Sequence, residues 1–166
     1  EEKEQLIFGI RPCDAKSFML LDKVFDGQCK EPYYINRRHR TIIVSIGCIQ
    51  PRATCFCTSL HGGPFSTEGS DLLLIDIGNE YVAQIVSDKG ARLLEDRGLE
   101  DASEDKLALA AGVIKASEAS MRPRVGMDGL KEKLDSSFDD PVWNQLSEKC
   151  IGCGVCTYLC PTCHCF

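Results

Sequence analysis

The sequence lacks the features of a membrane or secreted protein. Its apolar runs, such as TIIVSIG at 41–47 and DLLLIDIG at 71–78, are far shorter than the ~20 residues that a membrane-spanning helix needs. The opening residues, EEKEQ, are acidic and contain no apolar signal segment. We therefore expect a cytoplasmic chain without membrane insertion.

The chain also lacks an excess of positive charge and the common catalytic motifs. Its net charge of -6 and pI near 5.1 argue against nucleic-acid binding, which favours clustered lysine and arginine. It has no G-x-G-x-x-G motif, phosphate-binding P-loop or nucleophile elbow. These motifs therefore identify no catalytic residue in the chain.

Cysteine, by contrast, is abundant. The chain has 11 cysteines in 166 residues, about 7%, which is below the ~8–10% of small disulfide-bonded scaffolds. The odd number, the C-x-x-C spacings and the missing signal segment favour metal-binding thiolates over disulfides. Cys29 has no cysteine near it in the sequence, and we expect a small, buried thiol without a metal there.

The apolar pattern predicts an α/β fold with a small mixed sheet. Strands are expected at 6–10, 41–47, 71–77 and 80–86, with a hairpin turn at Gly78-Asn79. Asp14 is expected to N-cap a helix that ends near Phe25, and Pro32 to open a second helix. Further helices are expected near 88–96, 103–120, 128–136 and 141–149. The predicted units are an α/β domain at 1–97, a helical connector at 98–149 and a cysteine module at 150–166.

The most specific motif is Cys150-x2-Cys153-x2-Cys156-x3-Cys160, followed by proline. This is the ferredoxin spacing for a [4Fe–4S] cluster, in which the fourth cysteine ligates the other cluster of a two-cluster module. Gly152 and Gly154 permit positive φ angles and close approach of amides to sulfur. A zinc site is the alternative. We expect the chain to be a piece of a longer protein, with the second motif beyond residue 166.

A second group of cysteines follows the strand at 41–47. Cys48, Cys55 and Cys57 lie in a long loop at the end of this strand, where α/β folds place their sites. Cys13 follows the strand at 6–10 and would emerge at the same edge if the two strands are parallel neighbours. We expect these four thiols to form a metal site. Buried thiols or a redox-active C-x-C pair are the alternatives, and Asp14, Cys163 or Cys165 are the alternatives to Cys13 as fourth ligand.

Residues 37–40 (RRHR) form a basic turn in an otherwise acidic chain. A solvated helix face is the usual interpretation of such a run, and a docking patch or a clamp for an anionic cluster are the alternatives.

Several motifs, taken in order, resemble one known family. They are FGIRPCD, EPYYINRRHRTIIVSIGC, ATCFCTSL with GPF, DLLLIDI with DKG, and CIGCGVCTYLCPTCHCF. This order is similar to that in the iron–sulfur β subunits of sulfhydrogenases and in the related A-type subunits of anaerobic sulfite reductases, which contain a 4Fe-4S dicluster domain.

The resemblance implies an electron-transfer component of an oxidoreductase complex from an anaerobe, not the catalytic subunit. Its partners would be a flavin- or NAD(P)-dependent subunit and a hydrogenase or sulfur/sulfite reductase catalytic subunit. It implies two [4Fe–4S] clusters in the full-length protein, with Cys150, Cys153, Cys156 and Cys160 as ligands, and Cys48, Cys55 and Cys57 are candidates for a third. The alternatives are a zinc-stabilised interaction module and a thiol-based reductase that uses Cys55 and Cys57.

Overall fold

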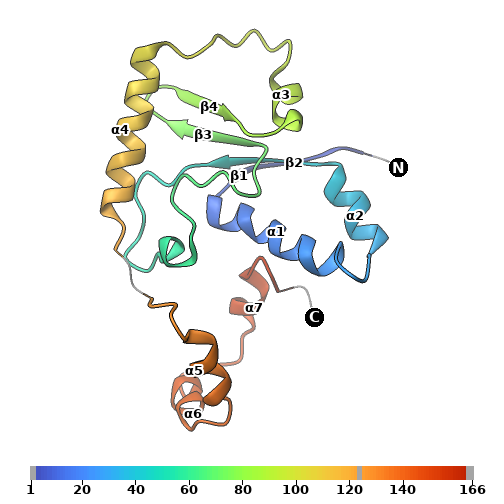
Figure 1. Ribbon diagram of the computed structural model, residues 1–166, viewed down its shortest axis with the longest axis vertical. Helices are drawn as coiled ribbons and strands as arrows, with labels where there is room; N and C mark the ends of the chain where they lie inside the picture. The colour runs from blue at the N-terminus through green and yellow to red at the C-terminus, as the bar shows by residue number, and fades with distance from the viewer. Residues whose placement is uncertain (1–2, 123–124, 164–166) are drawn as a thin grey trace.

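The protein is built on a four-stranded mixed sheet (Figure 1). The computed structural model describes residues 3–122 and 125–163. The strands are β1 (Gln5–Ile10), β2 (Thr41–Ile46), β3 (Leu72–Asp76) and β4 (Tyr81–Ile85), and they lie in this order across the sheet. β1, β2 and β3 run parallel, while β3 and β4 form an antiparallel hairpin. This arrangement confirms the predicted α/β fold with a mixed sheet.

Helices of different lengths connect and follow the strands. Their bounds are α1 (Pro12–Phe25), α2 (Pro32–His39), α3 (Asp88–Leu94), α4 (Glu104–Ser120), α5 (Leu130–Ser136), α6 (Val142–Ser147) and α7 (Val155–Leu159), with one 3-10 helix, η1 (Cys57–Leu60). The prediction that Asp14 N-caps α1 is wrong, because the helix begins at Pro12 with Arg11 as its N-cap. Proline suits the first helical turn since its missing N–H needs no partner there.

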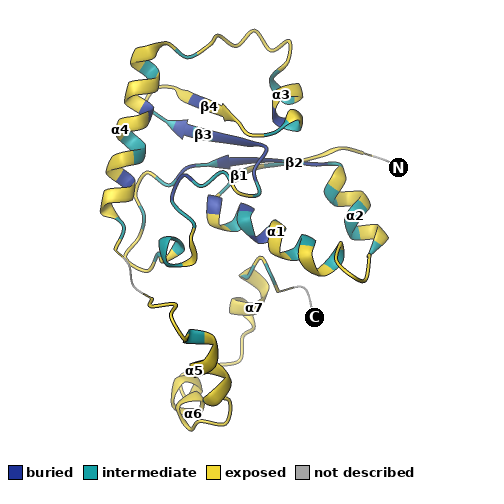
Figure 2. Ribbon diagram, in the orientation of Figure 1, coloured by how far each residue is buried: buried dark blue, intermediate teal, exposed yellow. Residues whose placement is uncertain are grey.

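The core lies between the sheet and the helices that cover it (Figure 2). In β2 the β-branched sequence is buried on both faces, and Ile43 and Ser45 have no exposed surface. The long helix α4 packs on β3 and β4. The main cluster of buried apolar side chains consists of Phe65, Leu73, Ile75, Val82 and Ala110. The predicted domain boundaries remain a prediction, and α4 packs on the sheet although it lies in the predicted connector.

A buried carboxylate ties the middle of the sheet to α3. Asp71 accepts a hydrogen bond from the Ile43 amide (2.8 Å) and another from the Ser87 hydroxyl. Ser87 is the N-cap of α3, and its oxygen also accepts from the Gly90 amide. One carboxylate thus holds β2 and the start of α3 together.

Replacing Asp71 with alanine is expected to lower the free energy of unfolding by about 3 kcal/mol, because a buried amide and hydroxyl lose a charged acceptor. Urea unfolding of the reduced protein measures this change. Asp76→Ala is the matched control, since Asp76 accepts only from the exposed amide of Gly78 in a turn. The control should cost no more than about 1 kcal/mol, and equal losses in both variants would contradict this role for Asp71.

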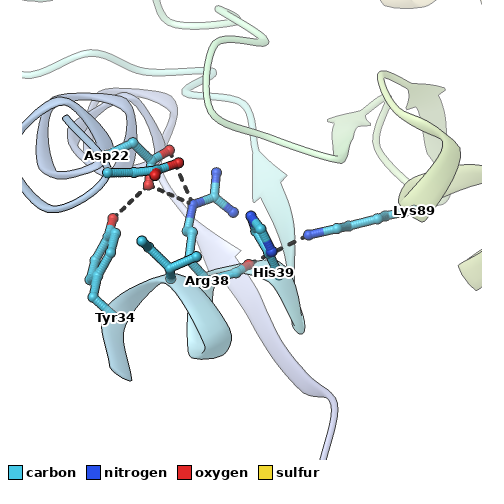
Figure 3. A pocket seen from close by; sticks show the side chains of 7 residues that line it. Asp22, Tyr34, Arg38, His39 and Lys89 are labelled. Atoms are coloured by element: carbon cyan, nitrogen blue, oxygen red, sulfur yellow. Dashed lines mark hydrogen bonds and ion pairs between the residues drawn. The ribbon is translucent and has the colours of Figure 1, made fainter. Parts of the chain in front are cut away.

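A polar network joins α1, α2 and α3 around a hollow of about 220 Å³ (Figure 3). Asp22 accepts from the Tyr34 hydroxyl (2.7 Å) and from Arg38 Nε (3.2 Å), and the Arg38 guanidinium lies 5.6 Å from the Phe18 ring centre. Partial burial and the nearby carboxylate raise the pKa of Tyr34. Lys89 donates to the Thr41 carbonyl oxygen at 3.2 Å. Within the basic turn, Arg38 therefore forms an internal ion pair that holds α2 against α1.

The C-terminal segment with α5, α6 and α7 is mostly exposed (Figure 2). It runs away from the sheet after α4 and returns toward α1 with α7 (Figure 1). Within the described residues, no helix combines the length and the apolar character needed to cross a membrane.

Candidate metal centre

The parallel pairing of β1 and β2 determines where the first cysteines lie. Leu6 pairs with Ile42 and Phe8 with Val44, so the carboxyl ends of both strands meet at one edge of the sheet. The loop after β1 leads directly into α1, whose second residue is Cys13. The loop after β2 begins with Gly47 and Cys48. The expectation that Cys13 and Cys48 emerge at the same edge is confirmed.

The loop after β2 is held in place by hydrogen bonds at its base and from two helices. The Cys48 amide donates to the Pro64 carbonyl oxygen (2.9 Å), which closes the base of the loop. The Ser117 hydroxyl of α4 donates to the Cys48 carbonyl oxygen (2.6 Å). The Lys16 ammonium of α1 donates to the carbonyl oxygen of Leu60 (3.2 Å) at the end of η1. The loop is therefore tied to α1 on one side and to α4 on the other.

Cys55 and Cys57 lie on the turn that leads into η1. The Cys55 amide donates to the Arg52 carbonyl oxygen (2.9 Å), and the Arg52 amide donates back to Cys55 Sγ (3.2 Å). Cys57 is the first residue of η1, and its carbonyl oxygen accepts from the Gly62 amide. This turn places both thiols on the side of the loop that faces a cavity, and it gives one sulfur an amide donor.

The four predicted thiols line one cavity of about 240 Å³. They are Cys13, Cys48, Cys55 and Cys57. Proline, phenylalanine and leucine side chains supply most of the remaining wall, with Phe56 and Leu60 from η1 and its N-cap. The structure therefore brings together the second group of cysteines, with Cys13 as its fourth member.

Burial weakens the acidity of the Cys13, Cys48 and Cys57 thiols. It raises the pKa of Cys13 to about 11, with added repulsion from Asp14 and from the Cys48 and Cys57 thiols. Burial also raises the pKa of Cys48 and of Cys57, and the neighbouring thiols add to both effects. The mutual repulsion follows from the proximity of the thiols, and a bound metal would have to displace their protons.

A second cavity of about 500 Å³ adjoins the first. Cys13, Phe56 and Cys57 line both cavities. Lys16 and Leu20 of α1 form one wall of the second cavity, and Pro161 and Thr162 of the C-terminal segment form another. The end of the terminal cysteine motif thus lies against the elements that carry the internal thiols. We call Cys13, Cys48, Cys55 and Cys57 the internal thiol site from here on.

The terminal motif folds as a loop followed by a short helix. Gly152 and Gly154 have φ angles of 68° and 72°, as their place in the motif predicts, and Gly154 precedes α7. The Gly152 amide donates to Cys150 Sγ at 3.4 Å. Cys160 is the C-cap of α7, and hydrogen bonds from the Thr162 side chain and backbone lower its pKa to about 7. Cys150, Cys153 and Cys156 are exposed.

The four thiols of the internal thiol site line cavities and do not converge on one point. Within residues 3–122 and 125–163, no three His, Cys, Asp or Glu side chains lie close enough to hold a single metal ion. Cys29 lies in the connection between α1 and α2 and lines neither cavity. It is exposed, so the expectation of a buried thiol there is wrong. Cys165, an alternative fourth ligand, lies outside the described residues, as does His164.

The sequence analysis did not identify the residues that hold the internal thiol site in place. Arg11 donates from Nη1 to the Gly47 carbonyl oxygen (3.0 Å), so it links the start of α1 to the end of β2. Lys16 and Ser117 hold the long loop from two helices. Only Arg11 had a signal in the sequence, because it lies two residues before Cys13 in the motif FGIRPCD.

Comparison with known proteins identifies a relative that matches almost the whole chain. No protein-family model matches the chain, and no solved structure matches it. Over 163 residues the chain is 34% identical to Sulfhydrogenase 2 subunit beta from Pyrococcus furiosus. The match covers 97% of this chain but 48% of the relative, so the chain spans about half the length of the curated protein it matches. The predicted resemblance to sulfhydrogenase β subunits is confirmed. The similarity to such a protein extends over almost the whole of this chain.

Proposed function

We propose that the chain is an electron-transfer component that binds [4Fe–4S] clusters. The observation that carries this proposal is the internal thiol site, in which four cysteines from two loops at one sheet edge line a single cavity. The relationship to a protein named as a sulfhydrogenase β subunit supports it. When bound, such a cluster accepts and donates single electrons.

The residues of the internal thiol site fit a cluster with four iron corners. Each corner takes one thiolate, so the four sulfurs surround the cluster. A single zinc ion would need all its sulfurs within about 2.3 Å of one point. The amide that donates to Cys55 Sγ and the apolar wall around Phe56 are of the kind that stabilise cluster sulfur and exclude water.

The terminal motif would supply further ligands. Cys150, Cys153 and Cys156 would bind one cluster and Cys160 another, as the ferredoxin spacing indicates. The Gly152 amide already donates to Cys150 Sγ. Because Thr162 lies against the second cavity, beside Cys13 and Cys57, an electron could pass between the terminal and internal sites within this chain.

The partners in this proposal are other subunits of a cytoplasmic redox complex from an anaerobe. One would be a flavin- or NAD(P)-dependent subunit, and the other a hydrogenase or a sulfur/sulfite reductase catalytic subunit. Residues of this chain would bind the clusters, orient them and exclude water, while the partner subunits would make and break bonds. The printed name of the relative, a β subunit, supports the presence of other subunits.

Two other functions are less well supported. A zinc-stabilised interaction module is favoured by the exposed C-x2-C pairs of the terminal motif, for which zinc is an alternative metal. A thiol-based reductase would need one thiol of low pKa in the C-x-C pair. Burial instead raises the pKa of Cys57, which counts against this mechanism.

Reduction of the anaerobically purified protein with dithionite tests the proposed function. A cluster protein should lose its brown visible absorbance on reduction and regain it on reoxidation by a redox dye, through one-electron steps. A zinc module would remain colourless throughout. Colourless protein that contains zinc in place of iron would contradict the proposal.

A further inference from the structure

Arg11 connects the two loops that carry the internal thiol site. Its side chain Nη1 donates to the carbonyl oxygens of Gly47 (3.0 Å) and Ile46 (3.4 Å), at the end of β2. Its own carbonyl oxygen accepts from the amides of Asp14 and Ala15, at 2.9 Å each, as the N-cap of α1. The guanidinium is therefore fixed at the base of both loops.

The guanidinium of Arg11 lies at the backbone that carries one of the thiols, because the Gly47 carbonyl oxygen that it contacts immediately precedes Cys48. In the part of the chain that the structure describes, Arg11 forms no ion pair with a carboxylate. Lys16, another cation near the site, is 2.7 Å from Glu68 Oε2, and this ion pair offsets its charge.

A cluster held by four thiolates is negatively charged, and reduction adds one more negative charge. A nearby fixed cation stabilises the reduced form more than the oxidised form and so raises the reduction potential. Arginine stays protonated at any working pH, so its charge does not change when the electron arrives. A single electron enters from the donor, and no bond forms or breaks.

We propose that Arg11 is a positioning residue that raises the reduction potential of the internal site, because its guanidinium fixes the end of β2 and places a permanent positive charge at the backbone that carries Cys48. This inference rests on the proposed function, since it requires a cluster at the internal thiol site. Arg11 contacts protein groups only, and its charge acts on the internal site from the backbone that carries Cys48.

The test is a redox titration of the full chain followed by electron paramagnetic resonance, with dithionite as reductant. The paramagnetic resonance signal of the internal cluster is identified as the one that is missing in the Cys57→Ala variant. In Arg11→Gln, the ratio of reduced to oxidised internal cluster at a fixed potential should fall about tenfold, which is about 59 mV for one electron. Iron and sulfide content should stay unchanged. Arg11→Lys keeps the charge and should shift this ratio less than Arg11→Gln does.

Arg52→Gln is the matched control. Arg52 lies in the same loop, but only its backbone amide contacts a thiol, at Cys55. It should change the ratio less than twofold. An unchanged potential in Arg11→Gln, or an equal shift in Arg52→Gln, would overturn the role of Arg11 and leave the proposed function intact.

Iron content separates the remaining outcomes. If Arg11→Gln loses the internal cluster, the iron content and the potential of Arg11→Lys distinguish the proposed role from a purely structural one. A loaded Arg11→Lys protein with nearly wild-type potential supports the proposal, whereas loss of iron there too assigns Arg11 a purely structural role and overturns it. If the wild-type protein has no signal that depends on Cys57, both this inference and the internal cluster of the proposed function fail.

Discussion

Replacing Cys57 with alanine is expected to remove one whole [4Fe–4S] cluster from the protein, and with it about four irons and four sulfides per chain. Cys57 lines both cavities, and η1 contains no second cysteine, so the substitution removes one of the four thiols of the internal thiol site. A [4Fe–4S] cluster loses iron readily when only three thiolates bind it and its site is partly open to solvent. Iron and acid-labile sulfide analysis of the anaerobically purified variant measures the loss.

Cys29→Ala is the matched control for this prediction. Cys29 is exposed, lies between α1 and α2, and lines neither cavity. Its replacement should leave the iron and sulfide content unchanged. If Cys57→Ala keeps its full cluster content, or if Cys29→Ala loses as much, Cys57 is not a ligand.

Replacing Gly69 with alanine is expected to destabilise the protein by more than about 4 kcal/mol, or to prevent folding. Gly69 has a φ angle of 80°, which costs a residue with a Cβ about 1–2 kcal/mol. A Cβ built at Gly69 would also lie 2.1 Å from the carbonyl oxygen of Ala15 in the first turns of α1. That oxygen is part of the backbone, so α1 itself would have to move, and Cys13 with it.

Gly98→Ala is the control that measures the backbone strain of a positive φ angle without a steric clash of the new Cβ. Gly98 has a φ angle of 66°, but a Cβ there meets no atom within 4 Å. It should cost only the conformational strain of about 1–2 kcal/mol. Urea unfolding measures both variants, and iron analysis shows whether the displacement of α1 also empties the internal thiol site. A Gly69→Ala protein as stable as Gly98→Ala would show that α1 is not docked as described.

The predicted fold was confirmed where local pattern and sheet geometry agree. The β-branched run at 41–47 predicted a doubly buried strand, and Ile43 in β2 is fully buried. The turn at Gly78-Asn79 predicted the β3–β4 hairpin. The start of α1 was predicted wrongly, because Asp14 is a good N-cap residue but Pro12 already occupies the first helical position. The preference of aspartate for the N-cap and the preference of proline for the first helical position both fit the sequence. Only the packing of α1 against the sheet decides between them.

The cysteines that line the candidate site could be placed together from the sequence, whereas the residues that hold its loops in position could not. Parallel pairing of β1 and β2 follows from the order of the elements, and it is enough to place Cys13 beside Cys48. The contacts of Arg11, Lys16 and Ser117 with backbone carbonyl oxygens join residues 36 to 69 positions apart. Such contacts depend on how loops and helices pack, which no short motif records.

The most direct test of the central claim is the metal content of a variant whose terminal motif cannot bind a cluster. Cys150, Cys153, Cys156 and Cys160 are replaced together with alanine, and iron and acid-labile sulfide are measured after anaerobic purification. The internal thiol site predicts about four irons and four sulfides per chain in this variant, with a visible absorbance that dithionite bleaches. Less than one iron per chain in a folded variant, or zinc in place of iron, would contradict the claim.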